Sequence, residues 1–178
     1  MHDSSLAHPH VVVMGVSGCG KSTVARGLAG TVGLRFADAD DFHPPANVEK
    51  MAAGVPLDDA DRLPWLRALA AWTAERAAAG EPTAMACSAL TRAHRDVLRG
   101  SPAPVAFIHL DGPPEVVAER LAGRDDHFMP PSLLDSQVAT LEPLGPDEEG
   151  VVLDLARDPA TLVAQAAAWV TSGVPAEG

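Results

Sequence analysis

The segment Gly15–Ser22 constrains the fold of this chain more than any other, because it matches the pattern G-x-x-x-x-G-K-[ST]. It follows the apolar run 11–14, which predicts a short buried strand, and it precedes apolar residues at helical spacing. Glycines at 15, 18 and 20 would let the backbone turn so that successive N–H groups point at one anion. The alternative is a glycine-rich turn with an accidental Gly-Lys-Ser, for which the odds of a chance match are well below about 1%. The segment therefore predicts a loop that binds nucleotide phosphates.

Within this loop, the residue types indicate separate roles. Lys21 would reach the β- and γ-phosphates, and the hydroxyl of Ser22 would ligate Mg²⁺. The N-terminus of the following helix would add its dipole. We therefore expect ATP and Mg²⁺ as cofactors, with the nucleotide bound by the loop and the first helical turn, namely Gly15, Val16, Ser17, Gly18, Cys19, Gly20, Lys21, Ser22 and Thr23.

Strands alternate with helices along the whole chain. Apolar runs predict strands at 11–14, 34–38, 83–87, 105–110 and 151–154. Helical patterns lie between and after them, at 24–32, 43–53, 58–79, 91–99, 113–124, up to about 140, and 160–172. The alternation predicts a single α/β domain over 1–178, with a parallel sheet covered on both faces. We expect a flexible N-terminus at 1–9 and a lid loop at about 124–131, where the pattern breaks.

Composition excludes several classes of function. The formal net charge of −11 argues against a nucleic-acid partner, which would favour a basic surface. No segment reaches the length of a membrane span, so we expect no membrane partner. The two cysteines cannot build a disulfide scaffold, and no signal peptide is recognisable at the start. A cytoplasmic protein with a small-molecule substrate is the expectation.

Other sequence features distinguish among the proteins that use such loops. A guanine-binding switch would need an Asn/Thr-Lys-x-Asp element, which the sequence lacks. The third predicted strand ends in Ala86-Cys87-Ser88, without the carboxylate that closes the magnesium-binding strand of many ATPase motors. Arginines are instead concentrated in the second half of the chain, at 92, 95, 99, 120 and 124. This distribution favours a small-molecule kinase with a closing lid.

An acidic cluster follows the second predicted strand, at Asp38, Asp40 and Asp41. Ligands collect at the carboxyl ends of strands in open parallel sheets, so these acids should face the phosphates. Asp38 could hold Mg²⁺ through water, while Asp40 could accept the proton of the attacking hydroxyl. The alternative is that Asp38 or Asp41 caps the following helix or faces solvent.

Three arginines are candidates for binding anionic groups. Arg62 is a natural bidentate partner for a substrate carboxylate, although the aspartates nearby could pair with it instead. Arg120 and Arg124 lie four residues apart on one predicted helix, just before the lid loop. From there they could neutralise charge on the transferring phosphoryl group, or they could form an exposed cationic stripe.

Taken together, these residues resemble the gluconate kinase (gluconokinase) family of P-loop kinases, relatives of shikimate and nucleoside monophosphate kinases. The likeness spans nearly the whole chain, and the segments after the phosphate loop are more specific than the loop itself. The matching segments are MGVSGCGKS at 14–22, DADDFHP at 38–44, NVEKM at 47–51, GVPLDDADR at 54–62, PWL at 64–66, CSAL at 87–90, RD at 95–96, HFM at 127–129 and LEP at 141–143.

The resemblance implies a five-stranded parallel sheet of order 2-3-1-4-5 with helices on both faces, a small lid and a homodimer. It implies ATP and Mg²⁺, D-gluconate as acceptor, and 6-phospho-D-gluconate as product, which feeds the pentose phosphate and Entner–Doudoroff routes. By analogy with shikimate kinases, Asp40 would act as the base and Arg62 would bind the carboxylate. We also predict that Ser88, Arg92 and His127 contact the acceptor.

The sequence departs from the family pattern at three positions, and other functions stay open. Family members often have Lys, Tyr and Gly where this chain has Thr91, His94 and Asp126. The first two departures weaken any expectation of substrate contact there, and the third adds negative charge to the lid. A kinase for another sugar acid or for shikimate is one alternative. A nucleotide-binding switch that binds ATP without turning over an acceptor is the other.

Overall fold

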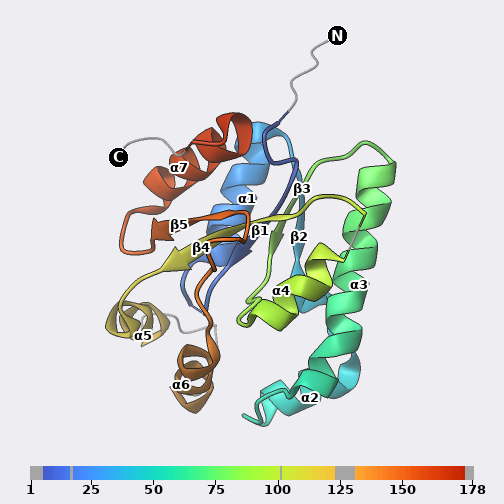
Figure 1. Ribbon diagram of the computed structural model, residues 1–178. Coiled ribbons are helices and arrows are strands. Elements are labelled where there is room, and N and C mark those ends of the chain that lie inside the picture. The colour runs from blue at the N-terminus through green and yellow to red at the C-terminus, as the bar shows by residue number, and fades with distance from the viewer. Residues whose placement is uncertain (1–5, 17, 101, 123–130, 175–178) are drawn as a thin grey trace.

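The computed structural model describes residues 6–16, 18–100, 102–122 and 131–174 (Figure 1). The predicted parallel sheet of order β2-β3-β1-β4-β5 is confirmed. Each strand lies within a residue or two of its predicted place, because the apolar runs of buried parallel strands are distinctive. The strands are β1 His10–Met14, β2 Arg35–Asp38, β3 Thr83–Ala86, β4 Ala106–Asp111 and β5 Gly150–Asp154.

Helices cover both faces of this sheet. On one face lie α1 (Lys21–Val32) and α7 (Pro159–Ser172), and on the other lie α3 (Asp59–Ala78) and α4 (Arg92–Arg99). Three other helices, α2 (Pro45–Ala52), α5 (Pro114–Ala122) and α6 (Pro131–Thr140), lie beyond the carboxyl ends of the strands (Figure 1). None of the described helices is long and apolar enough to cross a membrane.

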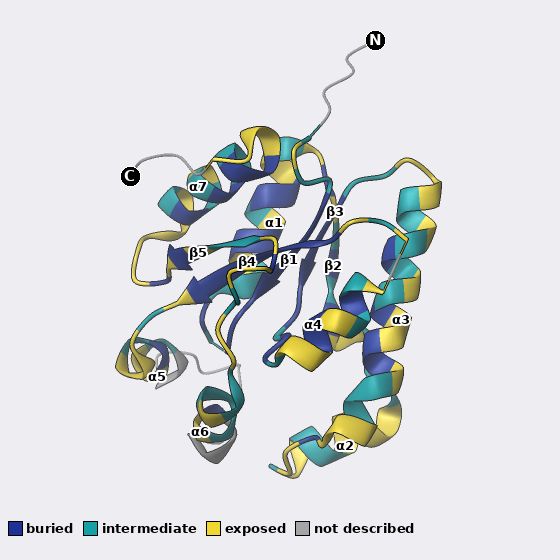
Figure 2. Ribbon diagram, viewed as in Figure 1, coloured by how far each residue is buried: buried dark blue, intermediate teal, exposed yellow. Residues whose placement is uncertain are grey.

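The central strand β1 divides its side chains between two hydrophobic cores. Val11 and Val13 pack in the cluster that contains α1 and α7, whereas Val12 and Met14 pack in the cluster that contains Trp65 of α3. All four side chains are buried, as the dark central strands of Figure 2 show. A strand buried on both faces explains why the run 11–14 is apolar throughout rather than alternating.

Two local features differ from the sequence prediction. The predicted helix at 43–53 begins only at Pro45, and a separate 3-10 turn, Ala39–Phe42, precedes it with His43 and Pro44 in between. The side chain of Asp38 starts this turn by accepting a hydrogen bond from the Asp40 N–H at 3.0 Å. A proline is tolerated in the first turn of a helix, where its missing N–H would have no partner anyway. At the opposite end of the sheet, the His8 ring stacks on Trp169 and the His8 backbone N–H donates to the Val170 carbonyl, so this part of the segment expected to be flexible contacts α7.

Candidate active site

The phosphate loop turns sharply at the end of β1. Gly15 has a φ of +148°, which side chains of L-residues rarely allow, and a Cβ at this position would lie 2.7 Å from the Cys19 sulfur. A second obstacle, the Leu110 carbonyl oxygen, would lie at 2.9 Å. Only glycine therefore fits here, and the loop wraps tightly around the buried Cys19. Ser17, which was predicted to bind nucleotide, lies outside the described residues.

The first turn of α1 carries the two polar side chains expected to act on phosphates and metal. Lys21 Nζ donates to the carbonyl of Val16 at 3.4 Å, so the ammonium group lies over its own loop. Ser22 Oγ donates to Asp38 Oδ2 at 3.0 Å and thereby connects α1 to the end of β2. Within the described ranges, no cluster of three or more His, Cys, Asp or Glu side chains could hold a metal ion. Ser22 and Asp38 offer two oxygen ligands, and a metal ion bound by them would take its other ligands from phosphate oxygens and water.

The acidic turn after β2 places Asp38 and Asp40 differently. Asp38 uses one carboxylate oxygen for Ser22 and the other for the Asp40 N–H, so it both caps the turn and faces the phosphate loop. The Asp40 side chain is 79% exposed. The turn is anchored to α3, because Trp65 Nε1 donates to the Ala39 carbonyl at 2.6 Å.

Arg62 presents a half-buried guanidinium near the same edge of the sheet. The side chain makes no hydrogen bond or ion pair with any other residue in the described ranges. Burial lowers its pKa, and the nearby Asp59, Asp58 and Asp61 raise it. A guanidinium in such a setting favours a carboxylate ligand.

The three neighbouring aspartates, which could have neutralised Arg62, have other partners. Asp58 and Asp61 form a reciprocal capping box at the start of α3. Asp61 also pairs with Lys50 of α2 at 2.7 Å, and Asp59 contacts His94 Nε2 at 3.2 Å. The alternative of a local ion pair for Arg62 is therefore absent from the described structure.

Cys87, directly after β3, connects the two sides of the site. Burial raises the pKa of its thiol to about 12, Lys21 acts to lower it, and Asp40 and Asp38 act to raise it. The same thiol also influences the pKa of Arg62. The strand register agrees with these influences, because Asp38 is paired with Ala86 at the end of β3 and the acidic turn therefore lies beside Cys87.

The loop after β3 is held by a buried ion pair. The carbonyl of Ser88 accepts a hydrogen bond from the Gly15 N–H at 3.3 Å, which brings this predicted substrate residue beside the phosphate loop. The next residue, Ala89, has a φ of +43°, and Arg95 Nη1 donates to its carbonyl at 3.0 Å. Arg95 is fully buried and pairs with Glu148 through two hydrogen bonds of 2.8 and 3.0 Å.

Thr91, Arg92 and His94, at the start of α4, already form hydrogen bonds with other residues of the protein. Thr91 caps α4 by accepting from the His94 N–H at 3.1 Å, and His94 Nδ1 accepts from the Thr91 N–H at 3.3 Å. Thr91 and His94, two of the residues that depart from the family pattern, thus form a capping box with each other. Arg92, predicted to bind substrate, is exposed and donates to Asp147 at 2.8 Å. Contact with a substrate would require Arg92 to leave that partner.

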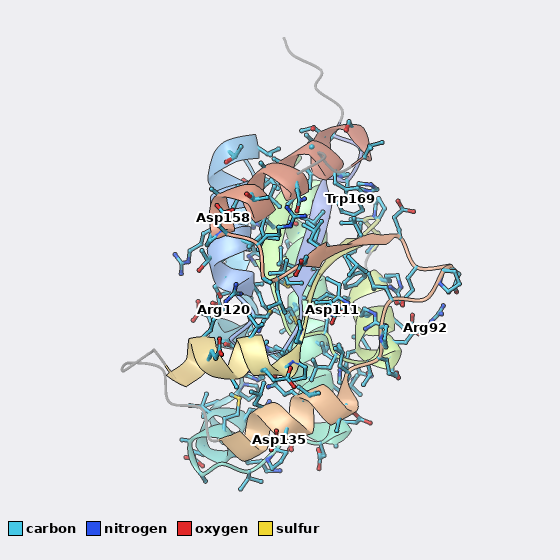
Figure 3. The ribbon with its side chains drawn as sticks, turned by 90° about the vertical axis from the view of Figure 1, so that its left-hand side faces the viewer. Arg92, Asp111, Arg120, Asp135, Asp158 and Trp169 are labelled. Atoms are coloured by element: carbon cyan, nitrogen blue, oxygen red, sulfur yellow. The ribbon has the colours of Figure 1, made fainter. Side chains whose placement is uncertain are left out.

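Arg120 is the member of the predicted arginine pair that the structure describes. Its Nη1 donates to the Cys19 carbonyl at 3.3 Å, and its Nη2 donates to the Leu155 carbonyl. Figure 3 shows the side chain reaching from α5 toward α1. Arg120 is therefore part of the phosphate-loop surroundings rather than of an exposed stripe. Arg124, Asp126 and His127 lie outside the described residues.

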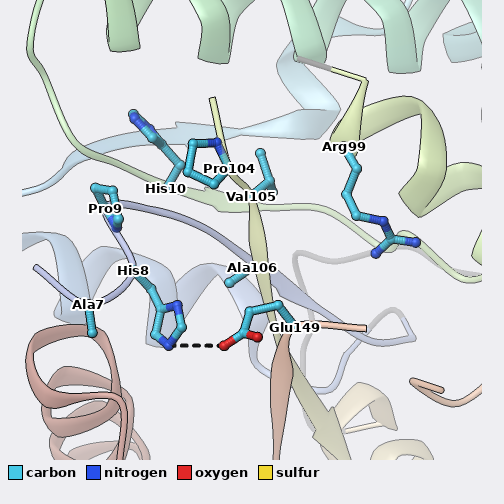
Figure 4. Close-up of a pocket in the computed structure, with 9 residues that line it drawn as sticks. All are labelled: Ala7, His8, Pro9, His10, Arg99, Pro104, Val105, Ala106 and Glu149. Carbon is cyan, nitrogen blue, oxygen red and sulfur yellow. Dashed lines mark ion pairs between the residues drawn. The ribbon is translucent and has the colours of Figure 1, made fainter. Parts of the chain in front are cut away.

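A cavity of about 270 Å³ lies at the opposite end of the sheet, beside the amino ends of β1 and β4 (Figure 4). None of the predicted site residues lines it. Its polar side chains already have partners, because His8 lies 3.6 Å from Glu149, His10 lies 2.9 Å from the Thr83 hydroxyl, and Arg99 pairs with Asp96 and Glu148. We therefore place the candidate site at the carboxyl ends of the strands.

His43 is a neighbour of the candidate base that the sequence analysis did not select. It follows the 3-10 turn, its side chain is only 3% exposed, and its Nε2 lies 3.9 Å from Asp40 Oδ1. Its ring stacks on Trp65 with 4.2 Å between centroids. The only signal in the sequence was a histidine three residues after the candidate base, inside a segment that matches the family.

Comparisons with known proteins agree with this geometry. The family model described as an AAA domain matches residues 11–144. The gluconokinase of Gluconobacter oxydans is 54% identical over 138 residues, which cover 78% of each chain. A sugar kinase structure from Janibacter has a TM-score of 0.88 at 54% identity and covers 96% of this chain and 99% of its own. A gluconokinase structure from Sinorhizobium meliloti has a TM-score of 0.84 at 44% identity and covers 93% of both chains.

Proposed function

The chain belongs to the gluconokinase family, and we propose that it transfers the γ-phosphoryl group of ATP to D-gluconate. The products would be 6-phospho-D-gluconate and ADP. The observation that carries the proposal is the half-buried Arg62 guanidinium, which lacks a partner in the described structure. Arg62 is on α3, whose Trp65 donates a hydrogen bond to the turn that carries Asp40. A sugar acid supplies both the carboxylate that this guanidinium favours and a hydroxyl that can accept phosphate.

In this proposal, Arg62 binds the carboxylate at one end of gluconate and so directs the primary hydroxyl at the other end toward Asp40. Asp40 accepts the hydroxyl proton as the oxygen attacks the γ-phosphorus. A new oxygen–phosphorus bond forms, the bond to the bridging oxygen of ADP breaks, and the electron pair leaves with ADP. The exposure of the Asp40 carboxylate supports its role, because an acceptor can reach it.

The residues at the phosphate site fit Mg²⁺. This cation prefers hard oxygen ligands and usually combines one or two protein oxygens with substrate phosphates and water. The Ser22 hydroxyl and the Asp38 carboxylate, which are 3.0 Å apart, are such ligands. Ser22 would hold the cation directly and Asp38 through water. Bound there, the cation would neutralise negative charge on the β- and γ-phosphates.

The remaining predicted residues complete the proposal. Lys21 stabilises the negative charge on the transferring phosphoryl group, and Arg120 and Arg124 stabilise the same charge from the side of the lid. Ser88, Arg92 and His127 contact the acceptor, Arg92 after exchange of its Asp147 partner. Family resemblance supports a homodimer, which light scattering would test. The use of ATP and the two buried free cysteines support a cytoplasmic location.

The test is a product analysis. Purified protein is incubated with ATP, Mg²⁺ and D-gluconate, and phosphorus–proton correlation spectra locate the new phosphate. We expect a phosphate on the primary hydroxyl, with one ADP released per product. The absence of gluconate-dependent ADP release would overturn the proposal and indicate a nucleotide-binding switch. A phosphate on another hydroxyl would contradict the orientation by Arg62.

A further inference from the structure

We propose that His43 is a positioning residue for phosphoryl transfer, held as the Nε2–H tautomer so that it donates to the Asp40 carboxylate. The inference rests on the proposed function, because it takes Asp40 as the base. The evidence is the packing around the His43 ring, which is separate from the phosphate loop.

The tautomer follows from the hydrogen bonds of Asn47. The Asn47 side-chain nitrogen donates to the backbone carbonyl of Asp61 at 2.9 Å. A carbonyl only accepts, so the amide orientation is set, and this atom is the NH₂ group. The same NH₂ group lies 3.2 Å from His43 Nδ1. Because the amide nitrogen has hydrogens to donate and no lone pair to accept, Nδ1 must be the accepting nitrogen. The ring proton of neutral His43 is therefore on Nε2.

The ring plane is held by aromatic packing. His43 and Trp65 are stacked with 4.2 Å between centroids and an interplanar angle of 14°. Trp65 is in turn fixed by its hydrogen bond to the Ala39 carbonyl, at the start of the turn that carries Asp40. With one nitrogen engaged and the ring stacked, rotation of the imidazole would break two sets of contacts. The Nε2–H direction is consequently defined before any substrate binds.

Asp40 is the carboxylate that lies near His43 Nε2. His43 Nε2 lies 3.9 Å from Asp40 Oδ1, which is longer than a hydrogen bond, and the Asp40 side chain is otherwise exposed. Catalytic hydrogen bonds are commonly long before substrate binds and shorten in the complex. A rotation of the exposed carboxylate closes the gap. One oxygen would then accept from His43, and the other would face the acceptor hydroxyl.

The surroundings favour a neutral ring. Burial lowers the pKa of His43, Asp40 raises it and Arg62 lowers it. Asp40 comes from the 3-10 turn and Arg62 from α3, while the α2 contact is the neutral Asn47. A neutral donor orients the carboxylate without taking its proton-accepting role. An imidazolium in the same place would compete with the substrate as the proton donor to Asp40.

A double-mutant cycle tests the inference through turnover. His43→Phe keeps a stacking ring but removes the N–H, and we expect kcat to fall about 10- to 100-fold, the effect of a hydrogen bond to a charged group. The KM for ATP should stay within about twofold of wild type. In an Asp40→Asn background, the same change should lower kcat by no more than about twofold, because His43 acts through that carboxylate. His43→Gln, whose amide can donate from a similar position, should exceed His43→Phe in kcat.

A matched control is His10→Phe, which removes another buried histidine, whose hydrogen-bond partner is Thr83 at the opposite end of the sheet. Its effect should combine additively with Asp40→Asn. If the His43→Phe effect is also additive with Asp40→Asn, His43 has only a structural role and the inference is overturned.

A second measurement requires no acceptor and separates this inference from the proposed function. Long-range proton–nitrogen spectra, with His43 assigned by its loss in His43→Phe, should show protonated Nε2 and unprotonated Nδ1. The Nε2 signal should shift in Asp40→Asn, whereas the His10 signals should not. A protonated Nδ1 would overturn the inference even if the protein phosphorylates gluconate. The predicted tautomer and shift would uphold the His43–Asp40 contact even if gluconate is not the acceptor.

Discussion

The hydroxyl of Ser22, in the first turn of α1, donates to the carboxylate of Asp38, the last residue of β2, at 3.0 Å. The bond joins two segments that are adjacent in space because β1 and β2 end at the same edge of the parallel sheet. It also brings together the two oxygens that a cation bound to ATP phosphates would need. The remaining features of the site are arranged around this pair.

Removal of the Asp38 carboxylate should weaken the use of magnesium. For Asp38→Asn we expect the Mg²⁺ concentration at half-maximal rate to rise about 10- to 100-fold, the usual cost of losing an outer-shell partner. Titration of turnover with Mg²⁺ at saturating ATP and gluconate measures this. Asp41→Asn, which changes an exposed neighbour, is the control and should match wild type. An unchanged Mg²⁺ requirement in Asp38→Asn would remove this residue from the metal site.

Lys21→Ala should remove a cation that stabilises charge on the transferring phosphoryl group. Loss of one such electrostatic contact lowers kcat by about 10²–10³. Steady-state kinetics at saturating ATP measure the change. Arg35→Ala, which removes an exposed cation that pairs with Glu81 at the start of β2, should lose far less. Turnover of Lys21→Ala near the wild-type rate would refute the phosphate-loop assignment.

Arg120→Ala should lower kcat more than it weakens ATP binding, because the arginine stabilises the charge that develops on the transferring phosphoryl group. Arg120→Lys should recover only part of the rate, because lysine lacks the fork that now contacts the Cys19 and Leu155 carbonyls. Comparison of kcat with the Kd for ATP separates the two effects. A variant that loses only ATP affinity would contradict a role in turnover.

The buried Arg95–Glu148 pair should make stability sensitive to acid. Burial raises the pKa of Glu148, but hydrogen bonds from Arg95, the Gly145 N–H and Arg99 outweigh burial and hold it at about 2. Because the folded pKa lies below the ordinary value of 4.5, the stabilisation is complete above pH 4.5 and is lost as the pH falls toward 2. Urea unfolding across this range should show the decline.

The corresponding variant is Glu148→Gln. It leaves the Arg95 charge buried without a counter-charge, so we expect the free energy of unfolding to fall by about 3–5 kcal/mol at pH 7. Part of the decline in stability below pH 4.5 should also disappear. Glu149→Gln, at an exposed neighbour, is the control. A loss in Glu148→Gln below about 0.5 kcal/mol, the usual range for surface changes, would contradict the account.

Much of the fold could be predicted from local pattern. The apolar run 11–14 and the glycines after it define a strand and a loop without reference to the rest of the chain. The strand order came from family resemblance, because local pattern does not define which strands are neighbours. The helix starting at Pro45 and the 3-10 turn before it were harder to foresee, because the boundary depends on the Asp38 side chain accepting from Asp40.

The placement of Lys21, Ser22 and Asp38 could be predicted from short segments, and their roles stay predictions. The site was not predictable where it depends on contacts distant in sequence. The pairing of Arg95 with Glu148, 53 residues away, and the stacking of His43 on Trp65 exist only in the folded chain. The availability of Arg62 likewise depends on Lys50 and His94 engaging the neighbouring aspartates.

The central claim is that Arg62 selects a carboxylate-bearing acceptor, and one measurement tests it directly. ADP release is followed with D-gluconate, D-glucose and shikimate, for wild type and Arg62→Ala. The account predicts that wild type uses gluconate with a far higher kcat/KM than glucose, because glucose would leave the guanidinium unpaired. It also predicts that Arg62→Ala raises KM and lowers kcat for gluconate and so narrows this preference. Equal turnover of glucose and gluconate by wild type would contradict it. A preference for shikimate, which also carries a carboxylate, would instead contradict the choice of gluconate as the acceptor.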